Sequence, residues 1–519
     1  MNNGDDKAEG WIQGHFGRPL FNNPMARALS RVGVIDIGSN SVRMVVFDGA
    51  ARSPAYFYNE KIMCALGEGL AATGRLNPGG RIRALNAMVR FKHLCETMNV
   101  DPLTAVATAA VRKAVDGDEF CRVIEAETGI GIHVLDGNEE ARFSAQGVLL
   151  GWPGSYGLVC DIGGYSMELA EINGDKVGRR LSTSLGPFAM QDIKGGRSAR
   201  KRHIREILSG ISDFLGEQNN RLFLVGGSWR AMAKIDMCRR GYPLNVLHEY
   251  RMSPKSVRET IKYMEVSGIE HLRANTDISL SRISLLPHAA EVLREVVKTF
   301  KPRDIAISSY GIREGLLFEH MPETLRDRDP LIEACQFAEH KDARLPGYGQ
   351  IVFEFIEPLF KSVRPDRMRI IKAACLLHDV SWRAHPDYRA EVCFDYATRA
   401  NLGGLTHRER VFLGLALLHR YSNKRNGAQF ENLNQLADDA DLLQAEVLGK
   451  AMRFAAMFWQ RKDSRIGILN LRPRKRILVL KLKSAAIPLF GEVAKTRFQS
   501  LANSLKAEPV IKFDERRSF

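Results

Sequence analysis

Apolar residues between positions 31 and 320 alternate between short strand-like runs and longer stretches with helical spacing. Residues 31–60 predict three strands, RVGVIDIG, SVRMVVF and PAYFY, with a hairpin turn at Asp48-Gly49 before the third. Residues 78–98 predict a helix, because apolar side chains recur there at near-helical spacing. Strands and helices continue to alternate through residue 150, which is typical of an α/β domain.

The same order of elements begins again near residue 155. GLVCDIGG, SMELAEI, a turn at Asn173-Gly174 and KVGRRLST repeat the opening strands, and RLFLVGGSWRAMAKI predicts a strand, a glycine turn and a helix. From about Asp327 onward only helical patterns remain. We therefore expect an α/β fold with two duplicated domains, residues 31–150 and 151–325, and an all-α C-terminal domain, residues 326–519. Residues 1–30 are expected to form a flexible leader.

One short element occurs in both halves. VIDIGSNS (34–41) and VCDIGGYS (159–166) share an aspartate, a glycine and a final serine at matching places. The aspartates stand at positions 36 and 161, and the same separation relates the turn at Asp48-Gly49 to that at Asn173-Gly174. A chance hairpin would rarely reproduce both turns, so we interpret the pattern as a repeat of whole domains.

The polar end of each copy suits a phosphate and a metal ion. Glycine lets the backbone approach a ligand closely, and successive N–H groups at a turn form an anion cradle. An aspartate at the strand end is well placed to hold Mg²⁺ directly or through water. For one copy, a tight hairpin whose aspartate caps the turn is the more ordinary interpretation, and the matched second copy favours the ligand site.

A third glycine turn follows the strand RLFLV and opens a helix. Its residues Gly226, Gly227 and Ser228 offer helix N-terminal amides to an anion. The turn matches neither the Walker pattern nor Gly-x-Gly-x-x-Gly, which disfavours P-loop and Rossmann folds.

The charge and composition of the chain limit the kinds of binding partner and the compartment that we expect. The 519-residue chain carries a formal charge of +15, with basic clusters at residues 197–205 and 471–483. Such a field favours a polyanion, although a generally basic, solvated surface explains it equally well. The eight cysteines include no Cys-x-x-Cys pair, which disfavours a zinc ribbon or a disulfide framework. No apolar run approaches the ~20 residues of a membrane span, and no signal-peptide core is visible, so we expect a cytoplasmic protein.

Together the motifs resemble the exopolyphosphatase / guanosine pentaphosphate phosphohydrolase family of the actin-like, sugar-kinase and Hsp70 ATPase superfamily. The resemblance runs in order through about residues 31–320 and is carried by DIGSNS, LGEGL, ATAAVRKA, GNEEAR, DIGG-x-S-x-E, VGGS and GIREGLL. It implies two actin-like (ribonuclease H-like) domains that release terminal orthophosphate from inorganic polyphosphate with Mg²⁺ and a water nucleophile. The helical remainder is similar to the HD-like C-terminal domain of the family's longer members.

The resemblance also implies roles for particular residues. The general base falls on Glu140, and the metal ligands fall on Asp161 and Glu168. Phosphate-binding positions fall on both repeated turns, on the third turn and on one arginine: Gly38, Ser39, Asn40, Ser41, Arg112, Gly163, Gly164, Ser166, Gly226, Gly227 and Ser228.

Chemistry supports these roles to different degrees. A glutamate in a first helical turn, as expected for Glu140, is by itself an ordinary partner of the helix dipole. Alternation along the strand places Ser166 and Glu168 on one face. The position equivalent to Glu168 in the first copy is Arg43, so the copies are expected to divide metal binding and phosphate binding. Tyr165 departs from the family pattern, which has a third glycine there, and tyrosine resists positive φ.

The expected helical domain contains a His-Asp pair, His378-Asp379. An HD metal site needs a further upstream histidine, and residues 345–372 contain none. We expect a structural HD-like domain without metal that supports a homodimer and extends a basic channel for the polymer. The predicted partner is polyphosphate, with guanosine pentaphosphate (pppGpp) as the alternative substrate and no nucleic acid. A non-catalytic sensor of either ligand is a second alternative.

Overall fold

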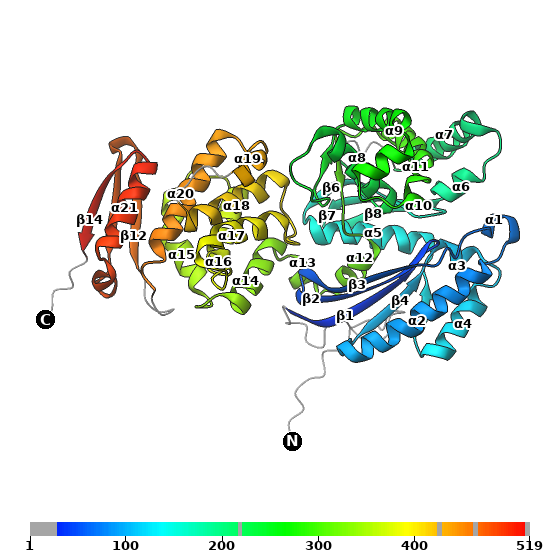
Figure 1. The fold of residues 1–519 in the computed structure, drawn as a ribbon, viewed down its shortest axis with the longest axis horizontal. Coiled ribbons are helices and arrows are strands. Elements are labelled where there is room, and N and C mark those ends of the chain that lie inside the picture. The colour runs from blue at the N-terminus through cyan, green and yellow to red at the C-terminus, as the bar shows by residue number, and fades with distance from the viewer. Residues whose placement is uncertain (1–27, 216–220, 423–427, 460–465, 514–519) are drawn as a thin grey trace, which may run out of the picture. The chain divides into compact units, whose positions relative to one another are not determined.

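The computed structural model describes residues 28–215, 221–422, 428–459 and 466–513. It divides into two compact units, one ending at Arg328 and the other beginning at Asp329 (Figure 1). The predicted leader, residues 1–30, lies outside the described residues except for its last three. Those three belong to the first strand, which begins at Ala28.

The first unit opens with a five-stranded sheet in the order β3-β2-β1-β4-β5. β1 pairs antiparallel with β2 and parallel with β4. The strands are β1 (Ala28–Ile37), β2 (Ser41–Ala50), β3 (Ser53–Met63), β4 (Leu103–Ala107) and β5 (Ile132–Val134). The helices of this half are α1 (Leu70–Thr73), α2 (Pro78–Met98), α3 (Ala109–Lys113), α4 (Gly117–Thr128) and α5 (Gly137–Gly151).

The second sheet repeats this topology. Its order is β10-β11-β9-β6-β7-β8, so β8-β7-β6-β9-β11 corresponds to β3-β2-β1-β4-β5 and confirms the predicted duplication. The strands are β6 (Ser155–Ile162), β7 (Met167–Gly174), β8 (Lys176–Thr183), β9 (Arg221–Val225), β10 (Arg251–Met252) and β11 (Asp304–Ile307). The helices are α6 (Pro187–Gln191), α7 (Gly196–Leu215), α8 (Gly227–Arg240), α9 (Pro254–Asn275), α10 (Leu280–Ile283), α11 (Leu286–Phe300), α12 (Ile312–Glu319) and α13 (Glu323–Arg326).

Alternate faces of the strands build separate apolar cores. In β1, Ile35 and Ile37 join residues of α2 and α4, whereas Val32 and Val34 join residues of α5 and α12. Residues of β6, β7 and β9 complete that second core, so α5 and α12 lie between the two sheets (Figure 1). A third core packs the other face of the second sheet against α7, α8, α9 and α11.

The first predicted hairpin turn is displaced in the structure. Asp48 and Gly49 remain paired with β3, and the chain turns at Ala51 and Arg52 instead. Arg52 is buried, and its guanidinium donates to the carbonyl oxygens of Leu150 (2.6 Å) and Arg326 (3.0 Å). These distant acceptors fix the turn, which local Asp-Gly propensity alone could not locate.

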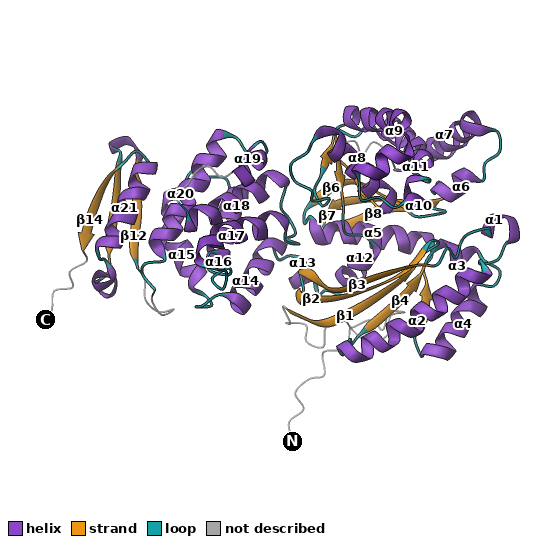
Figure 2. Ribbon diagram, viewed as in Figure 1, coloured by secondary structure: helices purple, strands orange, loops and turns teal. Residues whose placement is uncertain are grey.

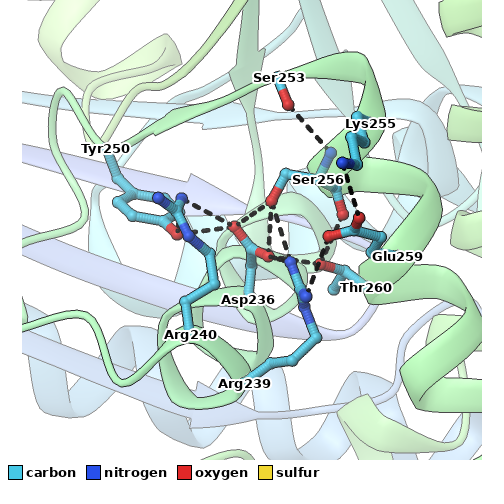
Figure 3. Close-up of polar contacts among 9 residues, drawn as sticks. All are labelled: Asp236, Arg239, Arg240, Tyr250, Ser253, Lys255, Ser256, Glu259 and Thr260. Carbon is cyan, nitrogen blue, oxygen red and sulfur yellow. Dashed lines mark hydrogen bonds and ion pairs between the residues drawn. The ribbon is translucent and has the colours of Figure 1, made fainter.

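A buried carboxylate ties α8 to the segment that follows it. Asp236 accepts hydrogen bonds from Tyr250 (2.6 Å), Ser256 (2.8 Å) and Thr260 (2.6 Å), as Figure 3 shows. Burial disfavours its ionisation, but these hydrogen bonds and that from Arg239 outweigh burial and lower its pKa. Asp236 thus anchors α9 as a charged group.

The second unit begins with helices and ends with a sheet (Figure 2). Its helices are α14 (Pro330–Asp342), α15 (Tyr348–Ile356), α16 (Pro365–Leu377), α17 (Arg389–Arg399), α18 (His407–Tyr421), α19 (Ala428–Asn434), α20 (Asp439–Ala455) and α21 (Glu492–Ser504). β12 (Gly467–Arg472), β13 (Ile477–Leu482) and β14 (Glu508–Phe513) form a three-stranded sheet. The expectation of helices alone therefore does not hold for residues 467–513. ILVLKL in β13 alternates with period two and buries Leu478, Leu480 and Leu482, which is a strand pattern.

The crossing of α5 and α12 depends on glycine. A Cβ at Gly315 would lie 1.8 Å from the carbonyl oxygen of Phe143, and one at Gly147 would lie 2.3 Å from that of Gly311. These neighbours are backbone atoms, so neither can move aside without shifting a helix. The two glycines therefore set how closely the helices between the sheets approach.

We expect Gly315→Ala to lower the free energy of unfolding by about 3 kcal/mol, because the added methyl overpacks a backbone contact. Gly210→Ala in α7 is the matched control, since a Cβ there meets nothing within 4 Å. It should raise stability by about 0.5–1 kcal/mol, because alanine has less conformational freedom in the unfolded chain. Urea unfolding measures both values, and an equal response of the two variants would contradict the packing argument.

Candidate active site

The carboxyl ends of the parallel strands in both sheets open into one pocket of the first unit, with a volume of about 240 Å³. Both repeated turns and the start of α8 line it, as expected for ligand sites of α/β sheets. Every predicted site residue except Arg112 is among the lining residues: Gly38, Ser39, Asn40, Ser41, Glu140, Asp161, Gly163, Gly164, Ser166, Glu168, Gly226, Gly227 and Ser228.

The two repeated turns have the same backbone geometry. The amide of Gly38 donates to the carbonyl of Ser41 at 3.0 Å, and the amide of Gly163 donates to that of Ser166 at 3.0 Å. In the strands that follow, Arg43 is paired with Asp36 and Glu168 is paired with Asp161. The first turn therefore presents an acid beside a base, and the second presents two acids.

Four carboxylates meet in this pocket: Asp36, Glu140, Asp161 and Glu168. Burial raises the pKa of each, and the neighbouring carboxylates raise those of Glu140 and Glu168 further. For Glu140 the result is a pKa of about 7, although the Arg112 guanidinium acts in the opposite direction. A carboxyl group of that pKa exchanges protons near neutral pH, which suits an acid–base role.

The carboxylates are held by hydroxyl groups from neighbouring elements. Ser144, one turn after Glu140 on α5, donates to Asp161, and Ser182 of β8 donates to Glu168 at 2.8 Å. A Cβ at Gly137 would lie 2.4 Å from Cβ of Ser182, so glycine there lets the start of α5 approach β8. These contacts fix Glu140 and the two predicted metal ligands in one neighbourhood.

Arg112 contacts the predicted base, Glu140, but is not among the residues that line the pocket. Its Nη1 contacts both Glu140 Oε1 and the carbonyl oxygen of Leu135. Glu140 is 3% exposed, whereas the Arg112 side chain is about one-quarter exposed. In this structure Arg112 orients Glu140 and partly offsets the effect of burial on its pKa.

Five cations also line the pocket, and only the first of them was expected near phosphate from the sequence: Arg43, Lys61, Arg230, Arg282 and Arg313. Burial, followed by the charge of Arg282, lowers the pKa of Lys61 to about 8. Burial, followed by the charge of Arg313, lowers that of Arg43 to about 10. Nη1 of Arg313 is buried and has no hydrogen-bond partner among the described residues. The cluster suits an anion with several charges.

Only some of these cations left a signal in the sequence. Arg43 follows from aligning the two turns, and Arg313 belongs to the GIREGLL motif. Lys61 ends up in the pocket through the pairing of β3 with β2, and Arg282 arrives from α10, far from any motif. Tertiary folding alone brings these two side chains to the site.

The third glycine turn makes room for one of these cations. A Cβ at Gly227 would lie 1.8 Å from Nη1 of Arg282, so the flexible arginine side chain would have to shift if any other residue stood there. Gly226 has φ +108°, and a Cβ there would lie 2.6 Å from the carbonyl oxygen of Ile162. Among the described residues no side chain caps the start of α8, so its first amides can bind an anion.

The donor set fits a hard divalent cation. Asp161 and Glu168 supply carboxylate oxygens. Burial and, after it, neighbouring carboxylates raise their pKa values, so a cation would stabilise their ionised forms. Within the described residues, however, no three His, Cys, Asp or Glu side chains lie close enough together to hold a metal ion. Mg²⁺ commonly keeps water and substrate phosphate oxygens as ligands, so two protein carboxylates are sufficient.

The His-Asp pair of the second unit is engaged by protein groups. Nδ1 of His378 lies 2.7 Å from the carbonyl oxygen of Cys375. The carboxylate of Asp379 pairs with the guanidinium of Arg344 and also accepts the backbone amide of Arg344 at 3.1 Å. Burial lowers the pKa of His378 to about 4, which favours a neutral ring.

The first basic cluster is partly neutralised. Residues 197–205 lie in α7, where Arg200 pairs with Glu291 (2.6 Å) and Arg205 pairs with Glu295 (2.7 Å). The second cluster spans β12 and β13. Among the described residues, no helix is long and apolar enough to cross a membrane.

The first unit thus consists of two duplicated α/β halves that share one charged pocket. The Ppx/GppA phosphatase family matches residues 45–324, and the family described as exopolyphosphatase, C-terminal, matches residues 362–508. The chain therefore belongs to the Ppx/GppA phosphatase family.

Individual relatives are distant. Retrograde regulation protein 2 of Saccharomyces cerevisiae is 24% identical over 436 residues, which cover 75% of this chain and 72% of the yeast protein. The crystal structure of an exopolyphosphatase from Cytophaga hutchinsonii has a TM-score of 0.52 and 23% identity, covering 56% of this chain and 98% of the solved one. An Aquifex aeolicus Ppx/GppA family member has a TM-score of 0.49 and 22% identity, covering 58% and 99%. At 23% identity, the likeness to the Cytophaga hutchinsonii structure shows the fold alone.

We expect tripolyphosphate binding to weaken about tenfold between pH 7 and pH 9 in the wild type relative to Lys61→Arg. Lysine is charged below its pKa of about 8 and loses that charge above it, whereas arginine stays protonated. Both proteins are titrated calorimetrically with the same ligand at each pH. The ratio of their dissociation constants is then independent of how the ligand ionises. Lys262→Arg, at an exposed position of α9, is the control and should follow the wild type. Parallel pH curves for wild type and Lys61→Arg would remove Lys61 from the anion site.

Proposed function

We propose that this protein is an exopolyphosphatase that hydrolyses the terminal orthophosphate from inorganic polyphosphate with Mg²⁺. The observation that carries the proposal is the buried Glu140, with a pKa near 7, in a pocket that both repeated turns and five cations line. Membership of the Ppx/GppA phosphatase family supports the reaction class.

Glu140 is the proposed general base. Its ionised carboxylate accepts a proton from the attacking water, while Arg112 holds the Glu140 carboxylate in place. The cations Arg43, Lys61, Arg230, Arg282 and Arg313 bind the non-bridging oxygens of the chain, together with amides of the repeated turns. Positioning and charge neutralisation are the main requirements of phosphoryl transfer, and this set of residues supplies both.

Asp161 and Glu168 are the proposed ligands of Mg²⁺. When bound, Mg²⁺ supplies neutralisation of negative charge on the phosphate chain. Ser144 and Ser182 orient the two carboxylates, and such supporting hydrogen bonds tune a metal site.

Two alternatives follow from specific observations. Hydrolysis of pppGpp would use the same pocket, because a nucleotide triphosphate end presents the same anionic groups. A non-catalytic sensing role is favoured by the similarity to a yeast protein named for retrograde regulation. The retained Glu140, Asp161 and Glu168 support catalysis over sensing.

The proposal extends to location and assembly. We place the enzyme in the cytoplasm, in keeping with cysteines that form no disulfide among the described residues. We also propose a homodimer in which the second unit, as an HD-like domain without metal, takes part in subunit contact and in holding the polymer.

Glu140→Gln should lower turnover of long-chain polyphosphate by about 10²- to 10⁴-fold with little change in KM, because an amide cannot accept the proton. In the wild type, kcat/KM should rise with pH up to about 7, as the free carboxyl group ionises. Phosphate release from polyphosphate and from pppGpp measures both effects and identifies the preferred substrate.

Glu139→Gln is the matched control for that experiment. Glu139 lies in the same helical turn, but its carboxylate caps α5 by accepting the amide of Asp136 at 2.9 Å. This variant should keep its turnover. Full activity of Glu140→Gln on both substrates would refute the assignment of the base, and a wild type that binds polyphosphate without releasing phosphate would favour the sensing role.

Asp161→Asn and Glu168→Gln should each raise the Mg²⁺ concentration needed for half-maximal activity by at least about tenfold, because each removes a proposed charged ligand. Calorimetric Mg²⁺ titration gives an independent value. Asp175→Asn, in the exposed turn between β7 and β8, should leave the Mg²⁺ requirement unchanged. An unchanged requirement in all three variants would exclude this metal site.

A further inference from the structure

Tyr165 joins the two halves of the first unit beside the pocket. It belongs to the second repeated turn, but its hydroxyl donates to the carbonyl oxygen of Gly67 at 2.7 Å. Gly67 lies in the LGEGL segment that follows β3, and its amide donates to the carbonyl oxygen of Ser39 in the first turn at 2.8 Å. Two hydrogen bonds through one residue thus connect the first turn to the second.

The ring of Tyr165 is buried and packs against apolar residues of both halves. Tyr165 is 8% exposed and belongs to the apolar core of the first half, together with residues of β1, β2 and α2. Its ring centroid lies 5.5 Å from that of Phe188, which lines the pocket. The aromatic ring therefore fills the space between the first half and the pocket wall of the second.

The two repeated turns and the segment around Gly67 are closely packed. A Cβ at Gly67 would lie 2.9 Å from Cε2 of Tyr165, and a Cβ at Gly164 would lie 3.0 Å from Cβ of Ser39. The two repeated turns are therefore in contact at this edge of the pocket. Tyr165 also lies outside the positive φ region, so the side chain causes no backbone strain there.

We propose that Tyr165 is a positioning residue that holds the two phosphate-binding turns at one fixed separation and so presets the pocket for its anion. The turns belong to separate halves, and a pocket built from both is complete only while their separation is correct. The hydrogen bond to Gly67 and the packing of the Tyr165 ring in the apolar core of the first half maintain that separation before the substrate arrives. The effect on kinetics rests on the proposed function, whereas the effect on the separation itself does not.

The expected kinetic effect follows from population arithmetic. If loss of Tyr165 lets the turns separate, only a fraction of molecules is ready to bind, and the apparent dissociation constant rises by the inverse of that fraction. Bound polyphosphate would contact both turns and bring them together in the molecules where they had separated. The saturated enzyme should therefore keep its kcat. A higher KM with an unchanged kcat therefore indicates that Tyr165 holds the pocket ready for its anion before binding.

Tyr165→Phe and Tyr165→Gly remove the contacts in two stages. The first deletes only the hydroxyl and should raise KM about fivefold, the equivalent of one ordinary hydrogen bond. The second also deletes the ring and should raise KM more than about tenfold, with kcat within about twofold of wild type in both. Tyr156→Phe, at an exposed position near the start of β6, is the control and should match wild type.

A double-mutant cycle tests whether the ring acts through Gly67. Gly67→Ala alone should raise KM as much as Tyr165→Gly, because the new methyl displaces the ring. In the Tyr165→Gly background the added methyl keeps only its contact with Cβ of Ser39, at 3.2 Å, so the same alanine should have a smaller further effect than in the wild type. Additive effects of the two substitutions would show that they act separately and would overturn the proposal.

Hydrogen–deuterium exchange tests the separation without relying on activity. Amides in residues 64–70 and 163–168 should exchange faster in Tyr165→Gly and slow again when tripolyphosphate is added. If these variants lose kcat and stability with KM and exchange near the site unchanged, Tyr165 is only a core residue and the inference fails. Absence of wild-type turnover together with the expected exchange pattern would refute the proposed function alone.

Discussion

Burial of opposite charges in one pocket is the constraint on which the rest of this structure depends. Burial raises the pKa values of four carboxylates there, and neighbouring carboxylates raise those of Glu140 and Glu168 further. Burial likewise lowers the pKa values of Arg43 and Lys61. Both groups are therefore less stable as ions than they would be in water. Under the proposed function, a metal ion would stabilise the ionised acids and a polyanion would stabilise the charged bases, so the two ligands would favour each other's binding.

The scaffold meets this constraint through a duplicated hairpin. Because Arg43 and Glu168 occupy equivalent positions opposite the two aspartates, the same backbone supports opposite charges in its two copies. Glycines then allow close approach where the copies and helices meet: Gly137 at β8, and Gly147 and Gly315 at the crossing of α5 and α12. The precision of the pocket therefore depends on backbone contacts some distance from its charged groups.

The second unit differs from the first in its secondary structure and in how its polar residues are used. Its His-Asp pair is held by hydrogen bonds and by the ion pair with Arg344, and its last part combines a three-stranded sheet with α21. A separate family model for exopolyphosphatase C-terminal regions matches residues 362–508, which include most of both parts. The helical and sheet portions thus belong to one recurring region.

The sequence by itself determined the α/β class, the duplication and the turn residues that line the pocket, because each depends on local periodicity or on a motif near a strand end. It did not determine the bend at Arg52, whose acceptors Leu150 and Arg326 are 98 and 274 residues away, or the sheet of residues 467–513, where period-two alternation is short. It also missed Lys61 and Arg282, since no local pattern carries them to the pocket. Tertiary structure alone decided that Arg112 contacts Glu140 and that Tyr165 bonds Gly67. Local spacing sets which backbone forms, whereas side-chain partners across the fold are set by packing of the complete chain.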